Sequence, residues 1–254
     1  MRTHLPVALT IAGSDSGGEA GIQADLKTFA ALKVHGTTAI TCITAQNRRA
    51  VTSVEACSPA MVREQLDAIA SEFTIGAAKT GMLDSRAIVH EVSKFFRRAR
   101  EIKLVVDPVI IATSGRRLLR LDGLRALQKE LLPLATLVTP NVAEAEILTG
   151  TKIATIDDLR ASARQIHKTF NCAALVKGGH LPGTNEALDF LSADDGEWMF
   201  SALRARGVTL HGAGCTYSAA ITAWLARGKP LVKSIEMAKE HITRVVHTTF
   251  LEKK

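Results

Sequence analysis

The chain has 254 residues, of which 46% are hydrophobic, 4% aromatic and 22% charged, and its formal net charge is +7. This length and composition favour a packed α/β core and exclude a largely disordered chain. No apolar run reaches the roughly 18 residues that cross a bilayer, so we expect no membrane partner. The four cysteines lack C-x-x-C spacing, which argues against a zinc site or a disulfide framework and is typical of the cytoplasm.

The positive charge raises the question of a nucleic-acid partner. The basic residues are spread along the chain in short groups, without a stripe interleaved with aromatic residues. We therefore expect a solvated basic surface that attracts anionic substrates, and no nucleic acid.

Strand and helix patterns alternate along the whole chain. Strands are predicted over 7–12, 37–44, 75–79, 103–107, 135–139 and 172–177, with a hairpin over 186–191 and 198–202. Helices are predicted over 20–32, 59–73, 84–98 (with Asp84 as N-cap), 122–131, 141–148 (with Asn141 as N-cap), 156–170, 215–226 and 233–250. Apolar strands that alternate with helices indicate a three-layer αβα fold, with a mostly parallel central sheet covered on both faces. Because no linker or repeat interrupts the pattern, we expect a single domain over 1–254.

The stretch 211–228 combines a glycine-rich turn with the start of a helix. Gly212, Ala213 and Gly214 precede Cys215, and such a turn leaves backbone N–H groups free to bind a phosphate. The helix dipole there would also favour the thiolate of Cys215. The alternative is a tight turn before a core helix that contains a buried cysteine.

Two common phosphate-binding motifs are absent. The only Gly-Lys pair precedes a proline, which excludes a P-loop, and Tyr217 occupies the last glycine position of a dinucleotide motif. The ends of predicted strands supply Asp107, Glu144 and Lys177 instead. Phosphoryl transfer needs a divalent cation and positive charge, and magnesium requires only one or two protein carboxylates.

Eight segments then identify a family, and they occur in the family's order: ALTIAGSDSGG (8–18), AGIQADLKTFAAL (20–32), ITAQN (43–47), KTGML (79–83), VVDPV (105–109), TPNVAEAEIL (139–148), LVKGGH (175–180) and HGAGCTYSAA (211–220). Through these segments the chain resembles the hydroxymethylpyrimidine and phosphomethylpyrimidine kinases of thiamine biosynthesis, in the ribokinase-like superfamily. The resemblance covers almost the whole length.

The resemblance implies ATP, Mg²⁺ and two successive phosphorylations of 4-amino-5-hydroxymethyl-2-methylpyrimidine, and the family tendency suggests a homodimer. It implies that Cys215 is the catalytic base or hydroxyl-orienting residue and that Gly212, Ala213 and Gly214 form the anion hole. The remaining positions that it implies are those for the pyrimidine (Gly13, Asp25, Gln46, Met82 and Val109), for ATP (Asp107, Glu144 and Lys177) and for magnesium, directly or through water (Asp107 and Glu144).

Each of these residues also has a plainer interpretation. By pattern alone, Asp25 is a surface charge, Gln46 and Lys177 are loop residues, and Met82 fills the core. Glu144 could complete a helix-capping interaction with the residue three positions before it. The resemblance favours the functional interpretation. His180 and His211 lie in matched motifs but are assigned no chemistry.

Two positions depart from the family pattern. Ala213 replaces the usual threonine, so the backbone amides remain while a hydroxyl contact is lost, and we expect reduced efficiency. Glu19 stands among residues that are usually small, where its carboxylate would either disfavour the second phosphorylation or point to solvent.

Two alternatives stay open at this point. Pyridoxal kinase has the same fold and a substrate that also bears a hydroxymethyl group, although Gln46 and Met82 favour the pyrimidine. A non-catalytic ligand-binding regulator is the other alternative, because fold does not fix function. The joint presence of Asp107, Glu144, Lys177 and Cys215 argues against it.

Overall fold

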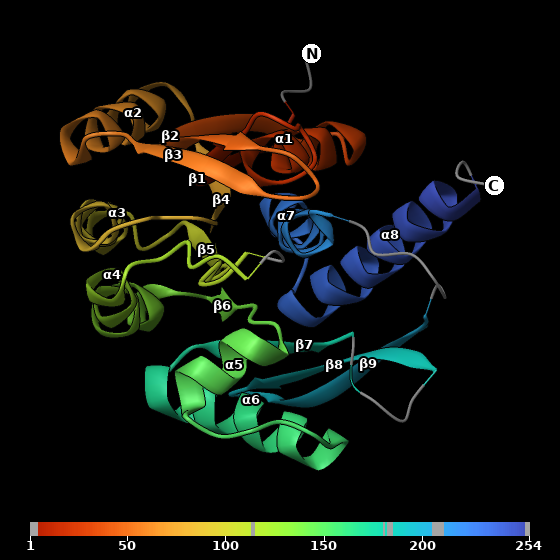
Figure 1. Ribbon diagram of the computed structural model, residues 1–254. Helices are drawn as coiled ribbons and strands as arrows, with labels where there is room; N and C mark the ends of the chain where they lie inside the picture. The colour runs from red at the N-terminus through yellow and green to blue at the C-terminus, as the bar shows by residue number, and fades with distance from the viewer. Residues whose placement is uncertain (1–4, 113–114, 180, 182–184, 205–210, 252–254) are drawn as a thin grey trace.

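The computed structural model describes residues 5–112, 115–179, 181, 185–204 and 211–251. The strands form one nine-stranded sheet in the order β3-β2-β1-β4-β5-β6-β7-β8-β9 (Figure 1). The strands are β1 (Val7–Asp15), β2 (His35–Gln46), β3 (Val51–Ala56), β4 (Ile75–Thr80), β5 (Lys103–Val106), β6 (Leu137–Val138), β7 (Ala173–Gly178), β8 (Glu186–Ala193) and β9 (Gly196–Leu203).

The centre of the sheet is parallel and its two edges are antiparallel. Strands β2, β1, β4, β5, β6 and β7 pair in parallel, whereas β3 and the hairpin of β8 and β9 pair antiparallel. Side chains of the central strands alternate between two apolar clusters, so that Leu104 and Val106 face one cluster and Val105 the other. The predicted mostly parallel sheet, buried on both faces, is confirmed.

Helices cover both faces of this sheet. They are α1 (Gly21–Ala31), α2 (Pro59–Glu72), α3 (Arg86–Arg98), α4 (Leu121–Ala126), α5 (Val142–Thr149), α6 (Ile156–Phe170), α7 (Ala213–Ala226) and α8 (Leu231–Leu251). Buried side chains of α2 to α6 belong to one apolar cluster, and those of α7 and α8 to another. Helices α1 and α7 share a third cluster, and Figure 1 shows α7 and α8 on the opposite side of the strands from α3 and α4.

Some predicted elements were wrong at their ends. Asp84 does not cap α3, because it adopts a left-handed φ of 59° and Ser85 occupies the N-cap position. Helix α4 ends at Ala126 and continues as a π-helical turn, Leu127–Leu131, followed by a 3₁₀ turn, Leu132–Leu134. Helix α6 has the predicted bounds, and a capping box of Thr155 and Asp158 fixes its start.

The edge strand β3 was missed because most of its side chains are exposed and it carries no buried apolar run. Among the described residues, no helix is long and apolar enough to cross a membrane.

Candidate functional site

The N terminus of α7 forms the glycine-rich turn at which we expect an anion to bind, called the anion-binding turn below. Gly212 has a φ of 79°, and a Cβ at this position would lie 1.9 Å from the carbonyl oxygen of Glu19, so only glycine fits. The N–H of Thr216 donates to the carbonyl of Gly212 at 2.9 Å, which closes the first turn. The N–H groups of residues 213–215 therefore lack intrahelical partners and can meet an anion.

Cys215 lies in this first turn, and the expected thiolate is a wrong prediction for the ligand-free protein. Burial raises the pKa of Cys215 to about 11, while the charge of Lys79 and the backbone N–H of Gly21 lower it only in part. Desolvation thus outweighs the helix terminus, and the residue rests as a thiol. The helix also begins two residues before the predicted start, at Ala213.

Asp107 and Lys177 form an ion pair beside this turn. Lys177 Nζ lies 3.0 Å from Asp107 Oδ1, and a Cβ on Gly214 would lie 3.4 Å from the same ammonium. The hydroxyls of Thr139 and Ser218 donate to the Asp107 carboxylate at 3.3 and 3.2 Å. Burial raises the pKa of Asp107, but the charges of Lys177 and Lys79 and the hydrogen bonds from Lys177 and Ser218 together outweigh it and hold the pKa below its ordinary value.

Glu144 is buried close to this pair. Its side chain accepts the N–H of Asn141 at 3.0 Å and the N–H of Ile110 at 3.2 Å, and the Asn141 side chain accepts the N–H of Glu144 in return. The capping interaction is therefore confirmed. Burial and the negative charge of Asp107 raise the pKa of Glu144 to about 7, which places a half-protonated carboxyl next to an ionised one.

Asp25 forms a second buried ion pair and is not the surface charge that its pattern alone would suggest. Lys79 Nζ lies 3.0 and 3.1 Å from its two oxygens, and the hydroxyl of Thr10 donates to it at 2.6 Å. Both charged side chains are 0% exposed. Burial lowers the pKa of Lys79, but the nearby acidic groups, Asp25 foremost, together outweigh it and raise the pKa above its ordinary range.

Four of the five predicted pyrimidine-binding residues lie in or just after neighbouring strands, and the fifth, Asp25, lies on α1. A Cβ on Gly13 would lie 2.6 Å from Cys42 Sγ and 3.7 Å from Met82 Sδ, so Gly13 and Met82 line one space. Val109 has a φ of 42°, which is strained for a β-branched residue and is common at functional sites.

Gln46 reaches across to the anion-binding turn. Its Nε2 lies 3.0 Å from His211 Nε2, one residue before Gly212. Glu19, one of the two departures from the family pattern, forms an ion pair with Arg48 rather than pointing freely to solvent. His180 lies outside the described residues.

The sequence patterns missed three functional neighbours. Lys79 and Thr10 hold Asp25, and Ser218 contacts Asp107 from the helix that carries Cys215. Lys79 had a usable signal, because a lysine at the end of an otherwise apolar strand must find a buried partner. Ser218 follows Cys215 by three residues, which places both on one helix face.

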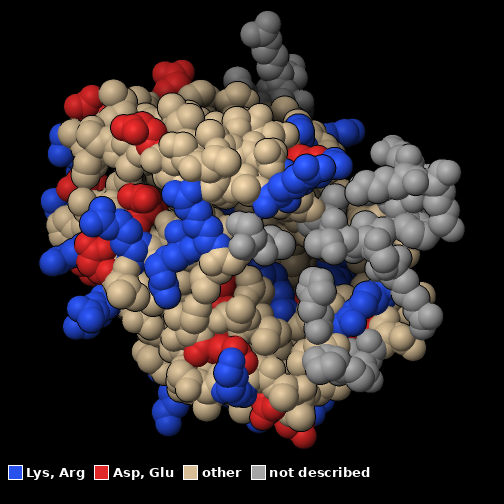
Figure 2. Space-filling view, viewed as in Figure 1, with Lys and Arg blue, Asp and Glu red and all other residues tan. Residues whose placement is uncertain are grey.

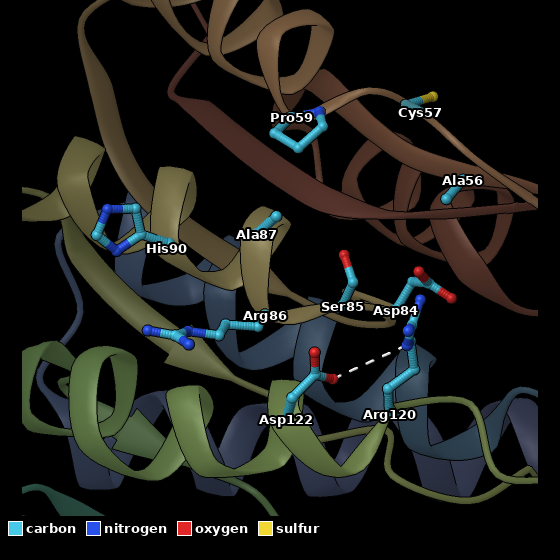
Figure 3. A pocket seen from close by; sticks show the side chains of 10 residues that line it. All are labelled: Ala56, Cys57, Pro59, Asp84, Ser85, Arg86, Ala87, His90, Arg120 and Asp122. Atoms are coloured by element: carbon cyan, nitrogen blue, oxygen red, sulfur yellow. Dashed lines mark ion pairs between the residues drawn. The ribbon is translucent and has the colours of Figure 1, made fainter.

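Two cavities lie apart from these residues. One, of about 540 Å³, is lined by residues from the end of β3 and the beginnings of α2, α3 and α4, and Figure 3 shows Arg120 and Asp122 paired at its wall. The other, of about 430 Å³, lies between α1, α7 and α8. None of the predicted site residues lines either cavity, so contacts and charges define the candidate site. On the face in Figure 2, basic side chains are interspersed with acidic ones.

A parallel α/β sheet whose carboxyl edge carries an anion-binding helix terminus, two acids and a lysine is typical of a phosphotransferase. A family model described as phosphomethylpyrimidine kinase matches residues 15–253. The chain is 49% identical to a hydroxymethylpyrimidine/phosphomethylpyrimidine kinase of Rhizobium meliloti (strain 1021), over 93% of this chain and 88% of that one. The protein belongs to the phosphomethylpyrimidine kinase family.

Solved structures agree with this assignment. A phosphomethylpyrimidine kinase from Clostridium difficile 630 superposes with a TM-score of 0.84 at 39% identity, covering 94% of this chain and 99% of that one. A pyridoxal kinase from Staphylococcus aureus, in complex with AMP-PCP and pyridoxal, superposes with a TM-score of 0.86 at 32% identity, covering 96% and 88%. The predicted family, ribokinase-like fold and kinase class are confirmed.

Proposed function

We propose that the protein transfers a phosphoryl group from ATP to 4-amino-5-hydroxymethyl-2-methylpyrimidine and then to the monophosphate, giving the diphosphate used in thiamine biosynthesis. The observation that carries this proposal is the first turn of α7. There, backbone N–H groups without intrahelical partners lie together with Cys215 and the ammonium of Lys177. Phosphoryl transfer depends mostly on positioning and charge stabilisation, which amide donors and a lysine supply.

Cys215 is proposed to handle the acceptor hydroxyl. With a pKa of about 11, Cys215 rests as a thiol, and its sulfur can orient the acceptor hydroxyl by accepting a hydrogen bond from it. To act as the base it must first release its own proton to solvent, and the charge of Lys79 favours the thiolate that then takes the hydroxyl proton. The amides of Ala213 and Gly214 are proposed to hold the transferred group, and Gly212 provides the turn that frees them.

Asp107, Glu144 and Lys177 are proposed to bind magnesium–ATP. Among the described residues, no group of three or more His, Cys, Asp or Glu side chains is placed to hold a metal ion. Two buried carboxyls still fit magnesium, which keeps several waters. Burial, and after it the charge of Asp107, raises the pKa of Glu144, and a bound cation would offset both effects. The bound cation would neutralise charge on the nucleotide phosphates.

The acceptor pocket is proposed to consist of Gly13, Asp25, Gln46, Met82 and Val109. Lys79 and Thr10 hydrogen-bond to the buried Asp25 carboxylate, so Asp25 is proposed to support the wall of the pocket. The Gln46 amide offers a donor and an acceptor to the aminopyrimidine edge.

Product analysis tests this function directly. The protein is incubated with the pyrimidine alcohol, ATP and Mg²⁺, and the phosphates on the pyrimidine are counted by mass spectrometry over time. We expect the monophosphate first and the diphosphate later, and neither product without Mg²⁺. Absence of any phosphorylated pyrimidine would refute the proposal. A parallel incubation with pyridoxal covers the alternative that the superposed pyridoxal kinase supports.

We also propose that the chain forms one catalytic domain, 1–254, that assembles as a homodimer in the cytoplasm. Light scattering of the purified protein tests the dimer.

A further inference from the structure

The loop of residues 16–20, between β1 and α1, lies against the first turn of α7. The carbonyl of Glu19 is the group that leaves no room for a Cβ on Gly212, the N-cap of α7. The backbone N–H of Gly21, the first residue of α1, hydrogen-bonds to Cys215. The end of the loop and the start of α1 therefore contact both the anion-binding turn and the cysteine that is proposed to handle the acceptor hydroxyl.

One side chain, Asp15, orders this loop. Its Oδ1 accepts the N–H of Gly17 at 2.8 Å, and its Oδ2 accepts those of Glu19 and Ala20 at 3.0 and 2.8 Å. Its carbonyl accepts the N–H of Gly18 at 3.0 Å. Asp15 is 3% exposed, and hydrogen bonds to a carboxylate are stronger than those between neutral groups. Asp15 thus binds the main chain of most of the loop from inside the protein.

Helix α1 depends on these bonds for its start. Its N-cap is Ala20, whose side chain makes no capping hydrogen bond. Gly21 has a φ of 55°, and a Cβ there would overlap the carbonyl of Gly13, so the helix begins pressed against β1. The Asp15 carboxylate takes the place of the missing capping side chain, and it fixes the direction from which the Gly21 N–H reaches Cys215.

The other side-chain contacts of the loop lie at the surface. The Ser16 hydroxyl donates to the end of β2, and Lys27 Nζ donates to a loop carbonyl, both in exposed positions. The ion pair of Arg48 and Glu19 has side chains that are 65% and 31% exposed. Exposed pairs contribute little free energy, so Asp15 is the principal buried tether of the loop.

We propose that Asp15 is a positioning residue for phosphoryl transfer, because it holds the loop that keeps Gly212 and Cys215 in place. This inference rests on the proposed function. Asp15 acts through the loop and does not contact the reacting atoms. A displacement of about 1 Å at the reacting groups can cost about 10²-fold in rate. Asp15 should therefore govern kcat more than the affinity for either substrate.

The kinetic test uses Asp15→Ala and Asp15→Asn in the full-length protein, with the pyrimidine alcohol, ATP and Mg²⁺. Asp15→Ala should lower kcat roughly 10²-fold, while KM for ATP and for the alcohol changes less than about threefold. Asp15→Asn keeps one side-chain oxygen that can accept part of the loop N–H groups, so it should recover part of the loss.

Asp158 gives a matched control at a distant loop. Its carboxylate accepts the N–H groups of Ala154 and Thr155 at 3.1 and 2.9 Å, just before α6. Asp158→Ala should lower the free energy of unfolding as Asp15→Ala does, but should leave kcat unchanged. The inference is overturned if both Asp15 variants lower kcat no more than Asp158→Ala, or if they raise KM with kcat unchanged.

Hydrogen exchange of the ligand-free protein, followed by NMR, tests the coupling without turnover. Asp15→Asn should speed exchange of the Gly21 and Thr216 N–H groups roughly tenfold, the equivalent of about one hydrogen bond, and Asp158→Asn should leave both unchanged. Unchanged exchange at Thr216 in Asp15→Asn would overturn the inference alone. A wild-type protein that phosphorylates neither the pyrimidine alcohol nor pyridoxal would overturn the proposed function instead, and the exchange measurement tells the two failures apart because it needs no substrate.

Discussion

Two buried lysine–aspartate pairs lie near the N terminus of α7, and they differ in what they leave accessible. Lys79 and Asp25 are both 0% exposed, and the Thr10 hydroxyl completes their hydrogen bonding. Lys177 is 13% exposed and faces the position of Gly214.

The difference shows that two ion pairs at the same edge of the sheet can have different roles. A fully buried ion pair contributes little net free energy to folding, but removing one partner leaves the other charge unpaired in the interior, so such a pair fixes the structure. A partly open pair keeps an ammonium that can exchange its partner for an incoming phosphate. We therefore assign the first pair to holding the acceptor pocket and the second to the transferred group.

The largest expected effect is at Cys215, which lies in the first turn of α7 beside the proposed phosphate site. Cys215→Ala should reduce kcat by roughly 10²–10⁴-fold, the range for loss of a general acid–base group, with little change in KM for ATP. Steady-state kinetics measure this. A variant that keeps most of its turnover would contradict the base role.

The resting thiol can be checked on the same residue. Because burial raises the pKa of Cys215 to about 11, its alkylation by iodoacetamide should accelerate up to about that pH, as followed by peptide mass spectrometry. If the alkylation rate instead reached half its maximum well below pH 11, the result would support the thiolate that the helix terminus was first expected to favour.

The two lysines should separate stability from activity. Lys79→Met leaves the Asp25 carboxylate buried and unpaired, so urea unfolding should show a loss of about 3–5 kcal/mol. Lys79→Met with Asp25→Asn should recover part of that loss. Lys177→Met should cost less stability, because the Asp107 carboxylate keeps the hydroxyls of Thr139 and Ser218 and the charge of Lys79, but should lower kcat about 10²–10³-fold. Equal stability losses in both single variants would break the distinction between the pairs.

Glu144 should make stability depend on pH in the ligand-free protein. Its folded pKa of about 7 lies above the ordinary 4.5, so the folded state holds a proton that the unfolded chain has lost. The stability that this proton contributes is complete below about pH 4.5 and disappears as pH rises through 7. The loss is of order 3 kcal/mol.

The measurement compares urea unfolding of wild type and Glu144→Gln at several pH values. The difference between them should change over pH 4.5 to 7, and Mg²⁺ should reduce that change if the cation binds the carboxylate. A constant difference over this range would show that the Glu144 proton is not linked to folding.

The fold could be predicted well from the sequence, because apolar runs such as Leu104, Val105 and Val106 directly indicate strands that are buried on both faces. The patterns also supplied the glycine-rich turn before Cys215 and the strand-end residues Asp107, Glu144 and Lys177, whereas the pyrimidine-binding residues came only through the resemblance. Patterns could not reveal that Lys79 seals Asp25 from 54 residues away, or that Arg48 takes the Glu19 carboxylate. Ionisation was also out of reach, because the helix terminus argues for a thiolate at Cys215 while the burial that opposes it exists only in the folded chain.

The smallest expected effect concerns Ala213, the first residue of α7. Ala213→Thr restores a hydroxyl beside the amides that are proposed to hold the phosphoryl group, and one added hydrogen bond should raise kcat/KM for ATP about threefold. Ala213→Val is the matched control, since valine has the branched shape of threonine without its hydroxyl. Valine should give no gain, and its β-branched side chain should cost the helix about as much as threonine does. Unchanged turnover and ATP affinity in the threonine variant would show that the anion-binding turn works through its backbone alone. In that case Lys177 and Asp107 would be the main side chains that contribute to binding the transferred phosphoryl group.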